Sequence, residues 1–411
     1  MNEETNVKEL SKRKKAMFSV KTMPFFMGLS NDLIFYIAIN TIFLTTVKQL
    51  TASQISFLTT VSFFCYIVLQ RPFLKIINKI GNTKSVRIGT IILLLGSIIL
   101  TFGKSYCTVM LGQVLYAVSY LFKSMDNVML KNNLAYLGKQ DDYIKYKNKA
   151  NIAYSIYTTI IALSAGHLFN INHYLPMYLG IAVCLINVFI SFKLNDENDS
   201  LTENIIDREE KKVNFTSLIL LIMFSYGIFY ATISTGQTNV KLLTQYQLEN
   251  YFEIGLTATY ISYILVMSRI TRVLSNISFY KVYDKVKDKV VYMLPALSGT
   301  AFVLVLVGSI VSHIVIKIIL MSIGFCIILG IRDVFSTYMQ DLLLKNVKHS
   351  EQQAGISYLG LSRKIGETSI SFIFSLMLLK VELIYIIVSL IILSLISFII
   401  NFKLYKMVRS N

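Results

Sequence analysis

Polar and ionisable side chains recur at helical spacing inside the long apolar stretches of this chain of 411 residues. In one stretch they are Tyr116, Tyr120, Lys123, Asp126 and Asn127. Because residues three or four apart share one face of an α-helix, these side chains are expected to point the same way. An ionised group near the centre of a membrane costs about 2.5 to 3.5 kcal/mol on insertion scales, so such a face must meet protein or water.

Five more apolar stretches carry a polar face of this kind. They contain Asn31, Asp32 and Asn40; Ser225, Thr232, Gly236 and Asn239; Ser262, Arg269, Arg272 and Asn276; Arg332, Asp333, Ser336, Thr337 and Gln340; and Gly360, Arg363, Lys364, Glu367 and Ser371. Ionisable groups inside a membrane span are typical of proton relays and of solute or ion pathways. The sequence therefore predicts a polar interior shared by several spans.

Asp32 is the first candidate for a proton-coupling residue, and Asp126 is the second. No lysine or arginine lies within one helical turn of Asp32 along its own helix. A desolvated carboxylate without a partner favours its protonated form, which suits a proton carrier. The alternative is that Asp32 pairs with Lys123 or with an arginine of another helix and does not titrate.

Unlike Asp32, the acids Glu367 and Asp126 each have a cation at helical spacing on their own helix. Arg363 and Glu367 are four residues apart, and Lys123 and Asp126 are three apart, so each pair can form an ion pair within one helix. Lys123 and Asp126 could thus belong to a site or to a scaffold.

Arg332 and Asp333 are adjacent, so their side chains should point in different directions on a helix. We expect each to pair with another helix, and the stretch with Arg363 and Glu367 offers partners. Two interpretations stay open for Arg332, Asp333, Arg363, Lys364 and Glu367. They form a structural or gating network, or at least Arg332 contacts the solute.

Cations outnumber acids inside the apolar stretches. The six cations are Lys123, Arg269, Arg272, Arg332, Arg363 and Lys364, and the four acids are Asp32, Asp126, Asp333 and Glu367. This balance favours an anionic or zwitterionic solute over a lipophilic cation.

The apolar stretches themselves indicate an integral membrane protein. Hydrophobic residues make up 54% of the chain, and they form blocks that approach the roughly 20 residues a membrane-spanning helix needs. We predict an all-α membrane protein with twelve spans. Their approximate ranges are 22–47, 53–73, 84–103, 106–135, 150–170, 174–193, 214–243, 254–280, 290–312, 314–344, 353–379 and 382–402.

The net charge of +17 is concentrated in every second gap between the spans. Lysine and arginine precede the first span and follow each even-numbered span, whereas the gaps between are poor in them. This alternation follows the positive-inside rule and places both termini in the cytoplasm. It also favours contact with membrane lipids and argues against a nucleic-acid partner.

A polar stretch separates two sets of six spans. We expect an N-terminal six-helix bundle at 1–193, a cytoplasmic linker at 194–213 and a C-terminal bundle at 214–411. FLKIINKI (73–80) and FYKVYDKV (279–286) follow the second and eighth spans, and SMDNV (124–128) and GIRDV (330–334) lie at the same offset of 206 residues. Two matches at one offset predict a parallel internal repeat, which is an arrangement of transporters that alternate access about a midplane site.

The chain resembles the major facilitator superfamily in its span number, its central polar stretch and the basic segment RPFLKIINKIGNTKS (71–85). Gly81 and Lys84 fit the signature of that family's loop after the second helix. Leu74 and Asn78 stand where a glycine and an aspartate are usual, and Asp284 keeps the acid in the second copy. IIALSAGHLF (160–169) has the small residues, but not the proline, of the fifth-span motif in the family's drug/proton antiporters.

In that family the first, fourth, seventh and tenth helices line a central cavity. The resemblance therefore implies a cavity with Asp32, Lys123, Asp126, Asn127, Arg332 and Asp333. We add Asn239 and Arg269 from the polar faces and Tyr120 as a stacking surface. The expected gating or ion-pair network consists of Arg363, Lys364, Glu367, Asn78 and Asp284.

These features predict a monomeric secondary active transporter in the cell membrane that exports a small organic or amphipathic solute in exchange for protons. Uptake or facilitated diffusion of a polar or anionic metabolite is one alternative, and a non-transporting accessory membrane protein is another. No set of residues at catalytic spacing indicates an enzyme. No glycine-rich phosphate loop and no spaced histidines are present, so we expect neither ATP, nor a metal, nor another cofactor.

Overall fold

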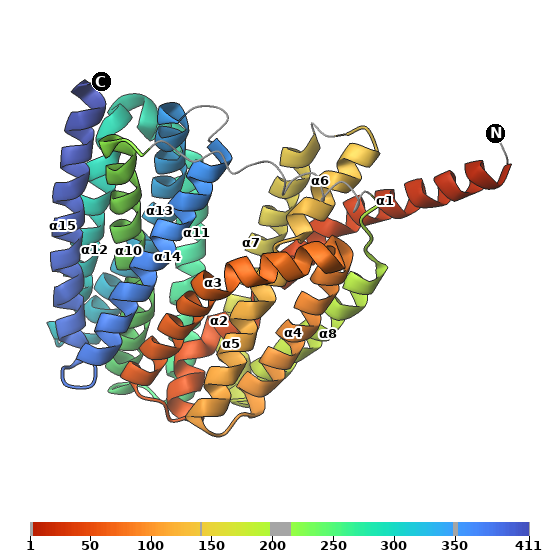
Figure 1. The fold of residues 1–411 in the computed structure, drawn as a ribbon. Coiled ribbons are helices and arrows are strands. Elements are labelled where there is room, and N and C mark those ends of the chain that lie inside the picture. The colour runs from red at the N-terminus through yellow and green to blue at the C-terminus, as the bar shows by residue number, and fades with distance from the viewer. Residues whose placement is uncertain (1–2, 140–141, 198–214, 348–351, 411) are drawn as a thin grey trace. The chain divides into compact units, whose positions relative to one another are not determined.

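The computed structural model describes residues 3–139, 142–197, 215–347 and 352–410, and it is helical with no strand in these ranges (Figure 1). The expected all-α class is therefore confirmed. The helices are α1 (Glu3–Ser30), α2 (Ile34–Ile42), α3 (Ala52–Ile80), α4 (Asn82–Phe102), α5 (Tyr106–Lys123), α6 (Asp126–Tyr136), α7 (Tyr143–Ile171), α8 (Leu175–Lys193), α10 (Ser217–Glu249), α11 (Ile254–Val286), α12 (Val290–Ile310), α13 (Ile314–Asn346), α14 (Gln352–Met377) and α15 (Leu383–Ser410). A π-helical turn, Phe43–Val47, continues α2.

Ten helical segments of the described chain are long and apolar enough to cross a membrane. The two other expected spans are the fourth and the eleventh. The fourth is divided between α5 and α6, and the eleventh, α14, contains Arg363, Lys364 and Glu367 near its middle. Both exceptions therefore arise where the sequence analysis found charged side chains inside a span.

The chain divides into two compact units, each with its own internal contacts. Unit 1 contains Met1–Ala38 and Val68–Glu209, and unit 2 contains Ile39–Ile67 and Glu210–Asn411. The division differs from the expected halves because the segment Ile39–Ile67 associates with the C-terminal helices. Ser53 Oγ in this segment donates to the Ser375 carbonyl oxygen at 2.6 Å, which ties the first turn of α3 to α14.

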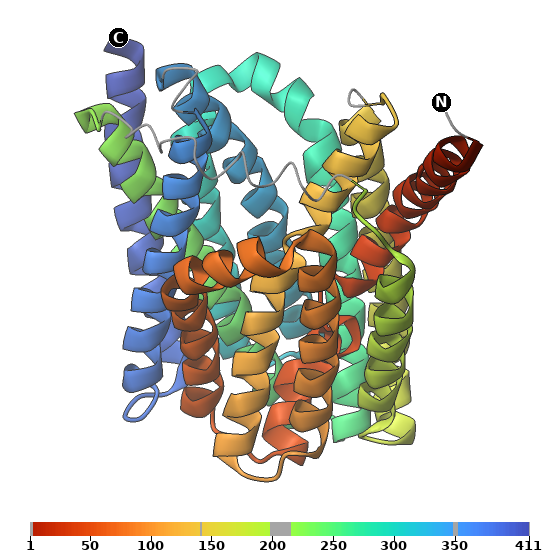
Figure 2. The ribbon, with the colours of Figure 1, turned by 45° about the vertical axis from the view of Figure 1, so that its right-hand side comes forward.

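In unit 2, α10 is the central helix. The helices α13, α14 and α15 pack along it (Figure 1 and Figure 2). A central position explains why most of α10 is buried, including the neutral polar face that the sequence predicts, Ser225, Thr232 and Asn239. That face meets protein and not lipid.

In unit 1, α1 packs on α6 and α7, and α4 packs on α5 and α8. Gly28 of α1 permits the close approach to α7, because a Cβ atom at this position would lie 3.0 Å from the backbone nitrogen of Tyr154. This contact places the side chain of Tyr154 beside the end of α1.

Two spans of unit 1 are interrupted inside apolar sequence. The first span breaks at residues 31–33, between α1 and α2, and the fourth breaks at Ser124 and Met125. Asn, Asp and Ser side chains compete with the backbone for hydrogen bonds and favour turns over helix interiors. Asn31 and Asp32 lie in the first break, and the Ser124 hydroxyl donates to the Leu121 carbonyl oxygen at 2.7 Å in the second.

Candidate functional site

Asp32 lies in the break of the first span, and three tyrosine hydroxyls surround its carboxylate. Tyr116 and Tyr120 of α5 donate to Oδ1, and Tyr154 of α7 donates to Oδ2 at 2.8 Å. Asp32 is half-buried and does not take part in an ion pair among the described residues. Lys123 of α5 is close enough to interact electrostatically with Asp32 without forming an ion pair. The sequence did not indicate Tyr154.

The hydroxyl of Tyr120 also reaches the carbonyl oxygen of Asn31. A carbonyl at a helix break loses its place in the helical ladder, and here the Tyr120 hydroxyl replaces the missing backbone donor. Tyr120 has a single proton to offer, so it can serve either the Asn31 carbonyl or the Asp32 carboxylate at one time. The backbone at this break and the charge of Asp32 therefore depend on the same hydroxyl.

The second break carries Lys123, Asp126 and Asn127. Lys123 is buried, with its ammonium 5.1 Å from the ring centre of Tyr120. Asp126 Oδ1 accepts from the Asn127 amide at 2.6 Å, and Lys147 donates to the amide oxygen of Asn127. The two breaks thus share Tyr120 as a neighbour.

The expected ion pair between Lys123 and Asp126 is not among the ion pairs of the described residues. That expectation assumed one continuous helix. Lys123 ends α5 and Asp126 begins α6, so the turn at residues 124–125 removes the spacing on which an i,i+3 pair depends. The two side chains are still close enough to interact electrostatically.

In unit 2, Asp333 of α13 binds two arginines. Arg272 of α11 forms an ion pair with Oδ2, and Arg332 Nε lies 3.3 Å from Oδ1. Arg332 also donates to Gln237 Oε1 of α10 at 3.3 Å. Each of the two residues contacts another helix, as expected, but the partners are on α10 and α11 and not on the eleventh span. Arg332 and Asp333 also contact each other, which was not expected, because adjacent side chains of this length can still converge.

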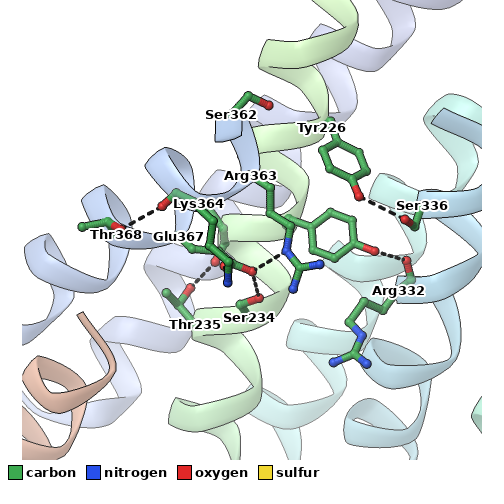
Figure 3. Close-up of polar contacts among 12 residues, drawn as sticks. Tyr226, Ser234, Thr235, Arg332, Ser336, Ser362, Arg363, Lys364, Glu367 and Thr368 are labelled. Carbon is green, nitrogen blue, oxygen red and sulfur yellow. Dashed lines mark hydrogen bonds and ion pairs between the residues drawn. The ribbon is translucent and has the colours of Figure 1, made fainter. Parts of the chain in front are cut away.

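Glu367 of α14 is the centre of a second ionic cluster and is 0% exposed. Its Oε1 accepts from Arg363 Nε at 2.8 Å and from Ser234 Oγ at 2.6 Å, and its Oε2 accepts from Lys364 Nζ at 2.9 Å (Figure 3). The expected pair between Arg363 and Glu367 is confirmed. These three distances are typical of charge-assisted hydrogen bonds.

Aromatic rings flank both cations of this cluster. The guanidinium carbon of Arg363 lies 4.2 Å from the ring centre of Tyr230 on α10. Lys364 Nζ lies 4.4 Å from the ring centre of Phe63 and 5.5 Å from that of Tyr66, both on α3. Cations over aromatic faces are stabilised by the ring quadrupole without losing their charge.

Tyr230 also connects this cluster to the arginines of α13. Its hydroxyl donates to the backbone oxygen of Arg332 at 2.9 Å, and the hydroxyls of Tyr226 and Ser336 are 3.0 Å apart. Figure 3 shows the hydrogen bonds to the backbone oxygen of Arg332 and between Tyr226 and Ser336. Tyr230 of α10 therefore touches one residue of each ionic cluster.

The remaining expected residues lie elsewhere. Asn239 is buried in α10, where its amide donates to the Thr235 carbonyl oxygen at 2.8 Å. Arg269 of α11 is half-buried and close enough to Lys241 of α10 to interact with it. Asp284 is exposed near the end of α11 and is not a contact of Arg363, Lys364 or Glu367. Asn78 lies in α3, and its side chain is outside the described part of the chain.

The sequence analysis missed Lys241, Ser234 and Gln237, all on α10. Lys241 is 8% exposed and donates to Asn40 Oδ1 at 2.7 Å. An ionisable residue within a predicted span was the available signal for Lys241. Ser234 and Gln237 gave no such signal, because neutral polar residues are common in membrane helices and only the packing of α10 on α13 and α14 shows their partners.

Among the residues that the structure describes, no three or more His, Cys, Asp or Glu side chains form a group that could hold a metal ion. The ionisable side chains form instead a carboxylate–tyrosine group at two helix breaks and two arginine–carboxylate clusters around α10. Groups of this kind can move a proton or hold a charged solute.

The family model of the Major Facilitator Superfamily matches residues 24–369. None of the curated proteins matches the chain. The crystal structure of the nucleoside transporter NupG is similar, with a TM-score of 0.73 and 12% sequence identity over 95% of this chain and 98% of that one. A bacterial homologue of the iron transporter ferroportin has a TM-score of 0.66 and 13% identity over 96% of this chain and 99% of that one.

A bacterial homologue of the human lysosomal transporter Spinster is also similar, with a TM-score of 0.63 and 10% identity over 96% of this chain and 97% of that one. Identities of this size show a shared fold alone. The expectation of a transporter fold is confirmed, and the solute has to be inferred from the residues of this chain.

Proposed function

Because the chain belongs to the major facilitator superfamily, we propose that it is a secondary active transporter that moves a small organic or amphipathic solute by alternating access and couples this movement to protons. The chain is a multi-pass membrane transporter and not an enzyme. The coupling, the direction and the solute are the proposed parts.

The observation that carries proton coupling is the set of partners of Asp32. Asp333 and Glu367 bind arginine or lysine, which can only donate hydrogen bonds and so favour the ionised carboxylate. Asp32 binds three tyrosine hydroxyls. A hydroxyl can donate to a carboxylate and can also accept from a protonated carboxyl, so the same partners can hold both states of Asp32.

Proton uptake at Asp32 changes the hydrogen bonds of the break. A protonated carboxyl needs fewer donors than a carboxylate, which releases the Tyr120 hydroxyl to the carbonyl of Asn31. The local backbone of the first span is then held differently in the two protonation states. Such a difference supplies the unequal proton affinity that a conformational equilibrium needs in order to be driven by protons.

Asp126 is the second proton-coupling candidate. It lies at the break of the fourth span, and its described hydrogen bond comes from the neutral amide of Asn127. Lys123, the last residue of α5 before this break, is buried. Discontinuous helices in transporters place ion and solute sites at their breaks, which supports a common role for Asp32 and Asp126.

We propose a monomer in the cell membrane, with both termini in the cytoplasm, that works in the outward direction. The alternation of basic gaps supports the orientation. Ser164, Ala165 and Gly166, near the end of α7, resemble the fifth-span motif of proton antiporters and support export.

Reconstitution into liposomes with an imposed pH gradient tests this function. A panel of anionic, zwitterionic, cationic and neutral solutes is presented, and accumulation is measured with and without a protonophore. The proposal predicts accumulation of at least one solute only while the proton gradient exists. Equal movement after collapse of the gradient would show facilitated diffusion, and movement of none of the solutes would favour the accessory-protein alternative.

A further inference from the structure

We propose that unit 2 recognises a small organic anion, with a carboxylate or phosphate group, between Arg332 of α13 and Arg363 of α14. This inference names the solute class of the proposed transport function and rests on that function for its biological meaning. The binding step itself does not need a proton gradient, so it can be tested separately.

The first step of the argument is charge. Each of the two ionic clusters around α10 contains two cations and one carboxylate, namely Arg272 and Arg332 with Asp333, and Arg363 and Lys364 with Glu367. One positive charge remains in each cluster. Half-buried charges that lack compensation are costly in a membrane protein, and an anion placed between the clusters would balance them.

The second step concerns the N–H donors of the two guanidinium groups that have no acceptor among the described residues. Arg363 uses Nε for Glu367, and no described residue accepts a hydrogen bond from its two terminal nitrogens. Arg332 uses Nε for Asp333 and one terminal nitrogen for Gln237, which leaves the other terminal nitrogen. A guanidinium held through Nε presents its outer edge as a planar fork, and this geometry matches carboxylate and phosphate oxygens.

The third step is access. The side chains of Arg363 and Arg332 are 33% and 22% exposed, whereas the carboxylate of Glu367 between its cations is 0% exposed. At this cluster the acid therefore lies behind its cations, whereas Asp333 in the other cluster is 25% exposed, as is its partner Arg272. A solute that approaches Glu367 meets the positive charge of Arg363 and Lys364 first.

The fourth step concerns the organic part of the solute. Phe63 and Tyr66 lie beside Lys364 in the same unit and are half-buried, so part of each ring is accessible. Tyr230 is buried and holds Arg363 in place with its ring and Arg332 with its hydroxyl. The arrangement offers apolar contact next to an oxyanion site.

Calorimetric titration of the purified protein in detergent tests the proposal with four probes that share one ring. The probes are benzoate, phenyl phosphate, benzylamine and benzyl alcohol. We expect binding of benzoate or phenyl phosphate, and the comparison of the two identifies the preferred oxyanion. Benzylamine and benzyl alcohol should bind at least tenfold more weakly.

The variants are Arg332→Gln, Arg363→Gln and Arg363→Lys, with the exposed Arg409→Gln as the matched control. Each of the first three should lower anion affinity about tenfold or more, because each removes a fork, and Arg409→Gln should not change it. Arg363→Lys keeps the charge beside Glu367, so it separates loss of the fork from loss of folding. Thermal unfolding of every variant identifies those that fail to fold.

Stronger binding of benzylamine than of both anions, absence of anion binding, or unchanged affinity in folded Arg332→Gln and Arg363→Lys would overturn the proposal. Asp32→Asn should retain anion binding even though it loses proton coupling. Failure of the anion site can thus be distinguished from failure of the coupling mechanism.

Discussion

At the scale of single residues, four acids in the apolar stretches divide by their partners. Glu367 and Asp333 are bound by cations, Asp126 by an amide and Asp32 by hydroxyls. The sequence predicted the pair between Arg363 and Glu367, because both lie on one helix at a spacing of four. It could not predict the tyrosines around Asp32, since contacts between helices depend on how the helices pack.

Glu367→Gln should lower stability. The change leaves Arg363 and Lys364 partly buried beside a neutral amide, and loss of one partner of a buried ion pair costs several kcal/mol. Both cations are partly exposed, so we expect a smaller cost of about 2 to 3 kcal/mol. The midpoint of thermal unfolding in detergent measures it, with the exposed Glu382→Gln as the control.

An unfolding midpoint of Glu367→Gln equal to that of the wild type would contradict this assignment. It would mean that Glu367 does not compensate Arg363 and Lys364, and the charge balance around α10 would have to be revised.

At the scale of helices, small residues allow α14 to approach α10. A Cβ atom at Gly366 would lie 2.6 Å from the carbonyl oxygen of Gly227. Small residues at helix crossings in membranes let two backbones come close. This crossing lies one residue from Glu367, and it is what brings Ser234 of α10 within 2.6 Å of the carboxylate.

Gly366→Ala should destabilise the protein by about 1 to 3 kcal/mol, because the added methyl group meets backbone that cannot move aside easily. Gly360 lies on the same helix, and a Cβ atom there would have no neighbour within 4 Å. Gly360→Ala should therefore be neutral or stabilising by up to about 1 kcal/mol, since alanine favours a helix. Unfolding midpoints of the two variants provide the comparison, and a reversed order would refute the close crossing.

The breaks in the first and fourth spans were not predicted. Apolar sequence flanks residues 31–33 and 124–125 on both sides, and neither break contains glycine or proline. The available signals were Asn31, Asp32 and Ser124, which favour turns, but polar residues in a span more often only mark its polar face. The offset that pairs 124–128 with 330–334 also gave no warning, because α13 continues through the second copy without a break.

At the scale of the whole molecule, the all-α class and the superfamily followed from the sequence, because hydropathy and charge patterns are set by the membrane and not by particular contacts. The internal repeat and the cytoplasmic position of both termini stay predictions. Most of the proposed linker, 198–213, lies outside the described residues. The described residues 194–197 belong to unit 1 and contact its helices, where Asp196 accepts from Asn82 of α4 and Asn132 of α6, each at 2.9 Å.

The orientation can be tested with a native cysteine. Cys107 is exposed at the start of α5, after a gap that the charge pattern places outside the cell, whereas Cys184 and Cys326 are buried. A membrane-impermeant maleimide should label intact cells at Cys107, and Cys107→Ser should remove that label. Labelling of Cys107 only after the cells are broken would reverse the proposed orientation.

The most direct test of the account compares two modes of transport in Asp32→Asn. In proteoliposomes, a solute found by the gradient assay is followed as exchange without a pH gradient and as accumulation with one. We predict that Asp32→Asn retains exchange within about threefold of the wild type but loses gradient-driven accumulation by at least tenfold, while Glu382→Gln retains both. Undiminished gradient-driven accumulation in Asp32→Asn would contradict the central role of this carboxylate.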